Sequence, residues 1–171
     1  MTIHSSHPFP TEPDPVRRLR GRLGGAVTLW TAGDPTDSTD WAGLTVTSVL
    51  VAGGEPGRVL GLLDPDADLT ERLLEVRTGV VQLLSWRHRD LADAFAGVAP
   101  APGGAWRLGE WTETPAGPRL SDATAWAEVS VEREEPLGWS TLVVCTLGEL
   151  ELAEDDEPLV HRRGRYLRSG S

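Results

Sequence analysis

The chain has 171 residues, a length typical of one domain with a sizeable hydrophobic core. It carries 26 acidic and 16 basic residues, a formal net charge of -10, and every one of those basic residues is an arginine. The absence of lysine excludes Schiff-base chemistry and a P-loop lysine. The acidic field disfavours nucleic acid and anionic membranes, so neither is expected as a partner.

The cysteine content and the N-terminal sequence indicate the cellular compartment. Cys145 is the single cysteine, so neither an intrachain disulfide nor a zinc site of several thiolates can form, and no metal site is expected. No run approaches the ~18 apolar residues that span a bilayer, and the N-terminus lacks the basic start and apolar stretch of a signal peptide. The sequence therefore predicts a reduced, cytoplasmic protein.

Three regions are expected along the chain. Residues 1–13 are polar and contain prolines without periodicity, which predicts a disordered leader. Residues 14–167 should form the folded domain, and residues 168–171 a flexible tail.

Helix signals occur at three places. Asp14-Pro15 supplies an N-cap and a first-turn proline for a helix that Gly24-Gly25 ends. Asp68 begins a segment with capping-box character, which predicts a helix that ends at Thr78-Gly79. A third helix is expected from about His88 to Ala96.

Period-two alternation and apolar runs predict the strands. In chain order they are 26–31, 44–51, 58–63, 80–84, 123–131 and one or two within 140–152. Residues 132–138 read as a turn, and residues 100–118 as a long loop with exposed Trp106 and Trp111. Many strands and few helices favour a closed or sandwiched antiparallel β architecture.

Asp64, Asp66, Asp68 and Glu75 match the carboxylate spacing of a calcium loop. Leu69 stands where that loop needs glycine for its sharp turn. The segment is therefore interpreted as a capped turn between a strand and a helix.

Two polar segments carry the remaining functional signal. Residues 43–48 form a strand rich in hydroxyl groups, which ordinary β propensity also explains. Residues 162–168 contain four arginines, which we expect to be the only concentrated positive field of the chain. Arginine pairs bidentately with phosphate, so this segment is either a solvated tail or a site for an anionic cofactor.

The order and spacing of several segments resemble the flavin reductase-like family of FMN-binding split barrels. The segments that carry the resemblance are 24–31, 43–48, Glu55-Pro56, the helix from Thr70 with the strand 79–84, the helix 91–97 and the closing segment 158–166.

The resemblance implies a mainly β fold, a six-stranded antiparallel Greek-key split barrel with a few short helices. It implies a homodimeric flavoprotein with FMN, or alternatively FAD, in a groove at the dimer interface, reduced by NADH or NADPH. The activity would be that of an NAD(P)H:flavin oxidoreductase, a flavin reductase that can supply a monooxygenase partner. No catalytic acid or base is assigned, because the hydride chemistry belongs to the cofactors.

The family's site transfers to nine positions of this sequence. Residues around the hydroxyl-rich strand would contact the isoalloxazine ring, the turn that begins with Asp64 and the helix start near Thr70 would receive the phosphate, and the closing segment would cover the ring or nicotinamide. The nine residues are Thr45, Val46, Thr47, Ser48, Asp64, Thr70, Arg162, Gly164 and Tyr166.

The turn and the closing segment depart from the family's pattern. Asp64 replaces the usual asparagine, Asp66 and Asp68 stand in the phosphate turn, and Arg162 replaces a histidine. Three carboxylates would repel a phosphate. The alternative is therefore a non-catalytic or degenerate split-barrel protein that binds flavin, deazaflavin or nothing.

Overall fold

A computed structural model describes residues 14–154 and 157–168. The predicted leader 1–13 and residues 169–171 of the predicted tail lie outside the described residues. Among the helices that are described, none has the length and apolar character needed to cross a membrane.

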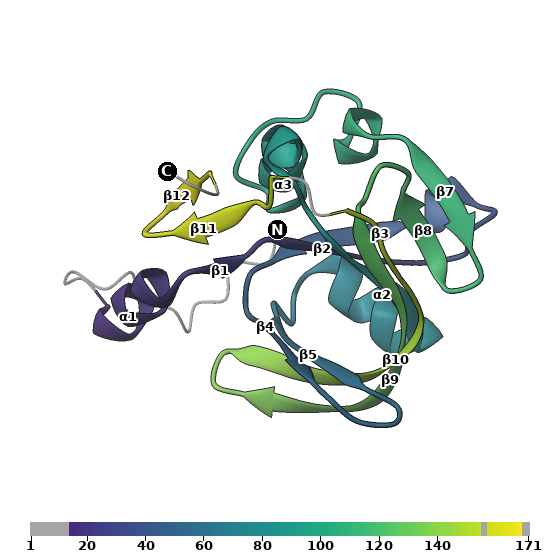
Figure 1. The fold of residues 1–171 in the computed structure, drawn as a ribbon, viewed down its shortest axis with the longest axis horizontal. Coiled ribbons are helices and arrows are strands. Elements are labelled where there is room, and N and C mark those ends of the chain that lie inside the picture. Colours follow the sequence, from purple (N-terminus) through teal and green to yellow (C-terminus); the bar gives the residue numbers. More distant parts are fainter. Residues whose placement is uncertain (1–13, 155–156, 169–171) are drawn as a thin grey trace.

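A curled antiparallel sheet of seven strands forms the body of the molecule (Figure 1). This confirms the mainly β split-barrel expectation, with seven strands in the main sheet in place of the six expected. In sheet order the strands are β3 (Ala42–Val46), β2 (Thr28–Ala32), β6 (Thr78–Leu83), β9 (Ala125–Leu137), β10 (Ser140–Leu152), β5 (Arg58–Leu63) and β4 (Val49–Ala52).

The prediction of a single strand at 44–51 is wrong, because the strand is interrupted at Thr47 and Ser48. Val46, the last residue of β3, pairs with Thr28, whereas Val49 begins the pairing of β4 with β5. The carbonyl of Ser48 accepts a hydrogen bond from the amide of Leu62 at 3.0 Å. The two consecutive strands thus become the opposite edges of the sheet, and the two-residue connection holds the end of β3 next to the start of β4.

The turn expected at 132–138 is also wrong. β9 continues to Leu137, and the chain reverses at Gly138 and Trp139, where Gly138 takes a positive φ of 58°. Residues 132–137 are all exposed. A strand that is exposed on both faces does not need the alternation of polar and apolar residues that marks a half-buried strand. The sequence pattern therefore did not indicate this part of β9.

The described residues contain three α-helices. α1 (Pro15–Leu23) begins as expected, with the Asp14 carboxylate accepting a hydrogen bond from the amide of Val16 at 3.0 Å. α2 (Asp68–Val76) has Ala67 at its N-cap and no side-chain cap, so the expected capping role of Asp68 is wrong. α3 (Arg89–Phe95) packs against β3 and follows a short 3₁₀ turn at Trp86–His88.

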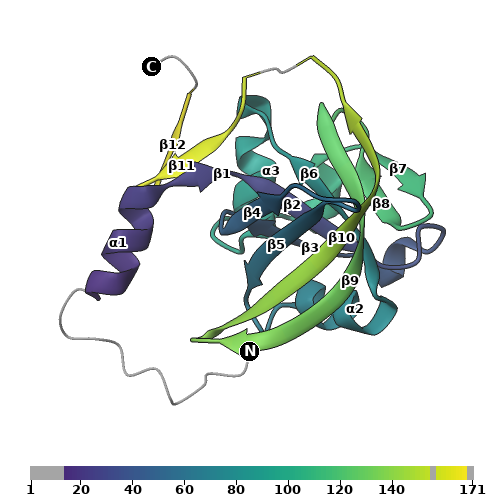
Figure 2. The same ribbon diagram turned by 60° about the horizontal axis from the view of Figure 1, so that its bottom comes forward.

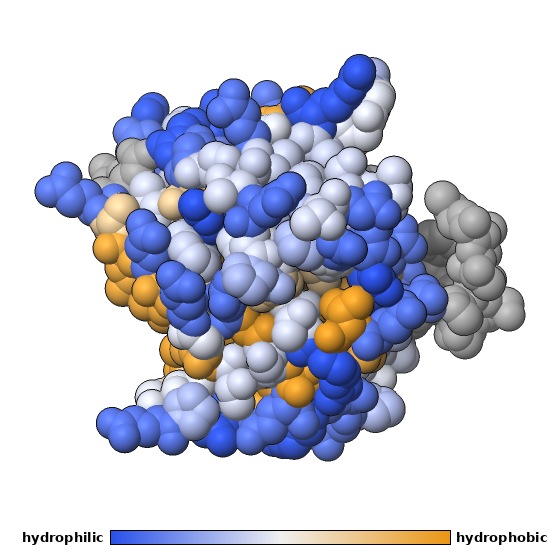
Figure 3. Space-filling model, turned by 90° about the vertical axis from the view of Figure 1, so that its right-hand side faces the viewer, coloured by the Kyte–Doolittle hydropathy of each residue, from blue (hydrophilic) through white to orange (hydrophobic). Residues whose placement is uncertain are grey.

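The expected loop at 100–118 contains structure of its own. It forms a 3₁₀ turn (Ala105–Leu108) and most of a hairpin of β7 (Trp111–Thr114) and β8 (Gly117–Leu120). Trp106 and Trp111 are half-buried and pack together with ring centroids 4.5 Å apart, so the expectation that they are exposed is wrong. The face on the β7–β8 side is largely hydrophilic, with separate apolar areas (Figure 3).

A small sheet joins both ends of the described chain and holds α1 away from the barrel (Figure 2). Its strands are β1 (Gly25–Ala26), β11 (Val160–Arg162) and β12 (Arg165–Leu167). β1 pairs with β11, and the amide of Arg163 donates a 2.9 Å hydrogen bond to the carbonyl of Gly21 on α1. No residue of α1 is buried, so this helix contributes a surface to the molecule and not to its core.

Candidate functional site

A cavity of about 1070 Å³ lies between α1 and the edges of the barrel. One wall comes from β3, β4, β5 and the connection between β3 and β4, and the other comes from α1 with the turn between β11 and β12. Its volume is slightly above the range of roughly 300–1,000 Å³ that is usual for small-molecule sites. The space is sufficient for a nucleotide-sized ligand.

The barrel wall offers backbone groups more than side chains. Thr45, Val46, Thr47 and Ser48 all line the cavity. However, the Thr45 hydroxyl donates a 2.6 Å hydrogen bond to the carbonyl of Ala92 on α3, and Val46 packs in the barrel core. Because β3 and β4 are edge strands, each has a row of N–H and C=O groups that the sheet does not pair. Such a row can recognise the polar edge of a planar heterocycle.

The opposite wall is cationic. Arg17, Arg18, Arg20 and Arg22 of α1 line the cavity, together with Arg163 from the C-terminal turn. Asp64 is the one carboxylate among the lining residues, so these side chains give the wall and its surroundings a formal charge of +4 from five arginines and one aspartate. A chain of net charge -10 thus gathers positive charge at this cavity.

Arginines elsewhere on the molecule are mostly engaged with carboxylates. The pairs are Arg58–Glu132, Arg72–Asp40, Arg77–Glu134, Arg87–Asp122, Arg133–Glu135 and Arg168–Glu157. Within the described residues, none of the five arginines of the cavity has an ion pair. The guanidinium groups of the cavity are therefore available to an anionic ligand.

The acidic turn reaches the cavity only at its first residue. Asp64 lines the cavity, and its carboxylate accepts a hydrogen bond from the amide of Asp66 at 2.9 Å. Asp66 and Asp68 are not among the lining residues. Thr70 lies away from the cavity: it is 2% exposed, and its hydroxyl donates a 2.6 Å hydrogen bond to the carbonyl of Asp64.

The closing segment is divided between the cavity and the body of the protein. Gly164 lines the cavity, whereas Arg162 and Tyr166 do not. The Arg162 Nε donates to the carbonyl of Arg22 at 3.0 Å. The Tyr166 hydroxyl donates to the Asp93 carboxylate at 2.6 Å, and burial together with this carboxylate raises the pKa of the phenol well above its usual value.

Sequence reasoning missed the arginines of α1. The expectation that residues 162–168 carry the only concentrated positive field is wrong, because α1 carries four arginines within the six residues 17–22. A helical projection of this segment separates Val16, Leu19 and Leu23 from the arginines and was the available signal. That these arginines face the barrel across a cavity depends on the pairing of β1 with β11.

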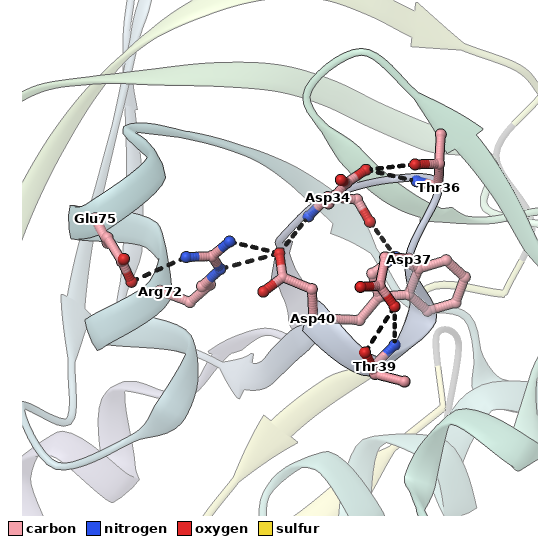
Figure 4. A network of polar contacts seen from close by, with 8 residues as sticks. Asp34, Thr36, Asp37, Thr39, Asp40, Arg72 and Glu75 are labelled. Carbon is pink, nitrogen blue, oxygen red and sulfur yellow. Dashed lines mark hydrogen bonds and ion pairs between the residues drawn. The ribbon is translucent and has the colours of Figure 1, made fainter.

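The carboxylate pattern that resembles a calcium loop is dispersed in the structure. The Glu75 carboxylate pairs with Arg72 at 2.9 Å, and Arg72 also holds Asp40 of the neighbouring loop (Figure 4). Asp34 and Asp37 accept hydrogen bonds from Thr36 and Thr39 in the same network. Among the described residues, no group of three or more histidine, cysteine, aspartate or glutamate side chains could hold a metal ion.

The titratable groups that line the cavity are few. Asp64 and His161 are its titratable residues besides the arginines. Cys145 lies in the barrel core, where burial raises the pKa of its thiol to about 12 and keeps it protonated. The edge strands β3 and β4, which line the cavity opposite a cationic wall, instead suit binding of a planar heterocycle that carries phosphate.

Comparison with known proteins identifies the family of the chain. Residues 20–170 match the flavin reductase like domain. The reductase component of the FADH(2)-dependent resorcinol hydroxylase of Rhizobium sp. (strain MTP-10005) is 31% identical over 152 residues, which cover 88% of this chain and 83% of the relative.

Two solved structures illustrate the shared fold. The NADH:FAD oxidoreductase SgcE6 of Streptomyces globisporus C-1027 superposes with a TM-score of 0.80 at 23% identity, over 96% of this chain and all of the other. The styrene monooxygenase flavin reductase of Pseudomonas putida S12 gives a TM-score of 0.79 at 21% identity, over 92% of this chain and 99% of the other. With the match that spans residues 20–170, these findings establish that the chain belongs to the flavin reductase family.

Proposed function

We propose that this protein is an NAD(P)H-dependent flavin reductase that uses FMN, with FAD as the alternative flavin, and supplies reduced flavin to a monooxygenase. The observation that carries the proposal is the cavity in which the edge strands β3 and β4 face the arginines of α1. Family membership supports the reaction class, and the cavity is the site that we propose for binding of the flavin.

The residues of this cavity fit a flavin. The uncharged edge offered by Thr47, Ser48 and the backbone of β3 matches the alternating donors and acceptors of an isoalloxazine ring. The arginines match the phosphate of the ribityl chain. Leu50, Leu60 and Leu142 add apolar surface against which a ring system can lie.

Held between the strand edge at Thr47 and Ser48 and the arginines of α1, a flavin would supply the hydride-transfer chemistry of the reaction. The protein's part is to bind and orient the two ligands, because the hydride chemistry belongs to the cofactors. Backbone groups at Thr47 and Ser48 would fix the plane of the ring. The turn at Gly164 would cover the cavity and limit the access of water.

A homodimer is part of this proposal. Val16, Leu19 and Leu23 form one face of α1 and are 72%, 61% and 77% exposed. Leu50 and Val51 of the edge strand β4 are also exposed. Because a helix with no buried residue gains little from its own chain, an apolar face of this kind supports burial against a second copy.

The monooxygenase partner and the compartment are supported indirectly. The resorcinol hydroxylase relative is named as a reductase component, and the styrene relative as the flavin reductase of a monooxygenase. A single buried cysteine is consistent with a reduced compartment, and we place the protein in the cytoplasm.

The test is to measure flavin binding and turnover with purified protein. Absorbance or fluorescence titration should show saturable binding of FMN or FAD, and NADH or NADPH oxidation should depend on added flavin. Running both flavins against both nicotinamides determines the preferred pair. Saturable flavin binding with no oxidation of either nicotinamide would contradict the reductase assignment.

One observation favours a second candidate, a non-catalytic flavin- or deazaflavin-binding protein. Asp64, in place of the family's asparagine, puts a carboxylate on the lining of the cavity. A carboxylate near the ring would disfavour the negative charge that a flavin acquires on reduction. A deazaflavin that binds tightly while FMN is not reduced would support this candidate over the first.

A further inference from the structure

We propose that the phosphate of the flavin is held by Arg17, Arg18, Arg20 and Arg22 of α1 with Arg163, and not by the turn before α2. This inference rests on the proposed function. It assigns to α1, a helix with no buried residue, the recognition of the charged end of the ligand.

The first argument is that the arginines of this wall have no carboxylate partner among the described residues. Each of the five arginines lines the cavity, and none has an ion pair among the residues that the structure describes. α1 contains no acidic residue in its first turn that could offset them. Guanidinium groups so close in sequence repel one another, and a bound phosphate, with a charge of about -1.5 to -2, would relieve that repulsion.

The second argument is the geometry of α1. Arg17 and Arg22 are separated by roughly 7.5 Å along the helix axis at 1.5 Å per residue. The amide of Arg163 donates to the carbonyl of Gly21 at 2.9 Å, which brings the fifth arginine beside the C-terminal half of the helix. Because all five arginines line the same cavity within this span, a phosphate bound there can accept bidentate hydrogen bonds from those that lie next to it.

The third argument is the unsuitability of the turn before α2. Asp64, Asp66 and Asp68 place three carboxylates within five residues of chain, and Glu71 adds a fourth in the first turn of α2. Of these four acidic residues, only Asp64 lines the cavity. A phosphate at the start of α2 would lie outside the cavity and against like charge, whereas at α1 it lies inside the cavity and against opposite charge.

Exchange of arginine for glutamine at α1 tests the assignment. Arg17→Gln/Arg20→Gln removes two charges one helical turn apart, and glutamine keeps a comparable helix propensity. Arg163→Gln removes the charge of the adjacent turn between β11 and β12. The matched control is Arg107→Gln/Arg133→Gln, which removes two charges from exposed positions that do not line the cavity. Circular dichroism should show the same fold for all of them, since every replaced arginine is exposed.

The readout is the dissociation constant of riboflavin, FMN and FAD, measured without nicotinamide. We expect the α1 double variant to bind FMN and FAD about tenfold or more weakly, because hydrogen bonds between charged groups are among the stronger polar contacts. Riboflavin, which lacks phosphate, should bind the wild type and the α1 double variant with the same dissociation constant. The control variant should match the wild type for all three ligands.

Other results would overturn the assignment. Unchanged FMN affinity in the α1 variants, with tighter binding in Asp66→Ser/Asp68→Ser, would place the phosphate at the turn before α2. An equal loss for riboflavin would mean that the arginines hold the ring. Weaker binding of ADP-ribose or NADPH alone would assign the arginines to the nicotinamide cofactor. A wild-type protein that binds no flavin would instead overturn the proposed function, so the two failures are distinguishable.

Discussion

The hydroxyl of Tyr166 in β12 donates a 2.6 Å hydrogen bond to the carboxylate of Asp93 in α3. This contact connects the hairpin of β11 and β12 to α3, the helix that packs against β3. β11 of the same hairpin pairs with β1 and so positions α1. A single polar contact between residues 73 positions apart therefore helps to place the cationic wall of the cavity.

Tyr166 is the only tyrosine of the chain, so its ionisation can be followed without interference. Burial and the Asp93 carboxylate raise its pKa, and the phenol should remain neutral at pH values where a free tyrosine, with a pKa of about 10, ionises. Phenolate absorbance measured against pH should rise at clearly higher pH in folded than in urea-unfolded protein. Coincident curves would contradict the contact.

The sign of the accompanying stability change follows from the raised pKa. The neutral phenol stabilises the folded state fully below the unfolded pKa, and this contribution is lost as the pH rises above about 10. Tyr166→Phe should cost about 1 kcal/mol at neutral pH and weaken the dependence on alkaline pH. Urea unfolding of the wild type and the variant, at neutral pH and above about pH 10, measures both the loss of stability and its dependence on pH.

Gly61 in β5 leaves room for the ring of Trp30. A Cβ at position 61 would lie 2.8 Å from two ring atoms of Trp30, which is itself buried in the barrel. Gly61→Ala should therefore lower the free energy of unfolding by about 1–3 kcal/mol, because a buried indole cannot move aside freely. The control is Gly53→Ala, whose Cβ would meet nothing within 4 Å. Equal thermal midpoints for the two variants would contradict this packing.

His88 and Asp122 form a partly buried pair beside the 3₁₀ turn. The Nδ1 of His88 accepts from the amide of Ser85 at 3.0 Å, so its Nε2 carries the proton that is donated to Asp122 at 3.0 Å. Burial opposes ionisation of Asp122, but the hydrogen bonds from His88 and Arg87 outweigh it and lower the pKa of the carboxyl.

A lowered carboxyl pKa contributes stability above the unfolded value, near pH 4, and that stability is lost as the pH falls through the folded pKa. Asp122→Asn should cost about 1 kcal/mol at neutral pH and reduce the loss of stability between about pH 5 and pH 3. Urea unfolding across this range is the measurement. An acid profile identical to that of the wild type would show that Asp122 is not coupled to folding.

The apolar face of α1 makes the proposed dimer testable. Leu19→Glu places a charge within the face formed with Val16 and Leu23, and the two-fold symmetry of a homodimer would apply this change twice. Association should weaken at least tenfold, because burial of one leucine side chain contributes about 1.5–3 kcal/mol. Light scattering after size exclusion measures the mass.

Val98→Glu is the control for this experiment, since Val98 is similarly exposed but lies in the segment after α3. A dimer that tolerates Leu19→Glu would place the interface elsewhere. A monomeric wild type would contradict the dimer itself.

Local signals in the sequence were sufficient for much of the fold. Asp14 and Pro15 predicted the start of α1, and the apolar run at 58–63 predicted β5 with its observed bounds. These features depend on neighbours a few residues apart, through capping and side-chain alternation. The resemblance in segment order likewise led to the family that the comparisons establish.

Only the tertiary structure decided how these elements form a cavity. Periodicity cannot show that residues 44–51 divide between two edges of one sheet, because both halves carry the same alternation. It also cannot show that Trp106 and Trp111 cover each other, since that requires the β7–β8 hairpin to fold back over α3. The composition revealed sixteen arginines, but the pairing of β1 with β11 determined which five of them face the barrel. Charge is a property of the residue, whereas a binding site requires distant residues to be held together.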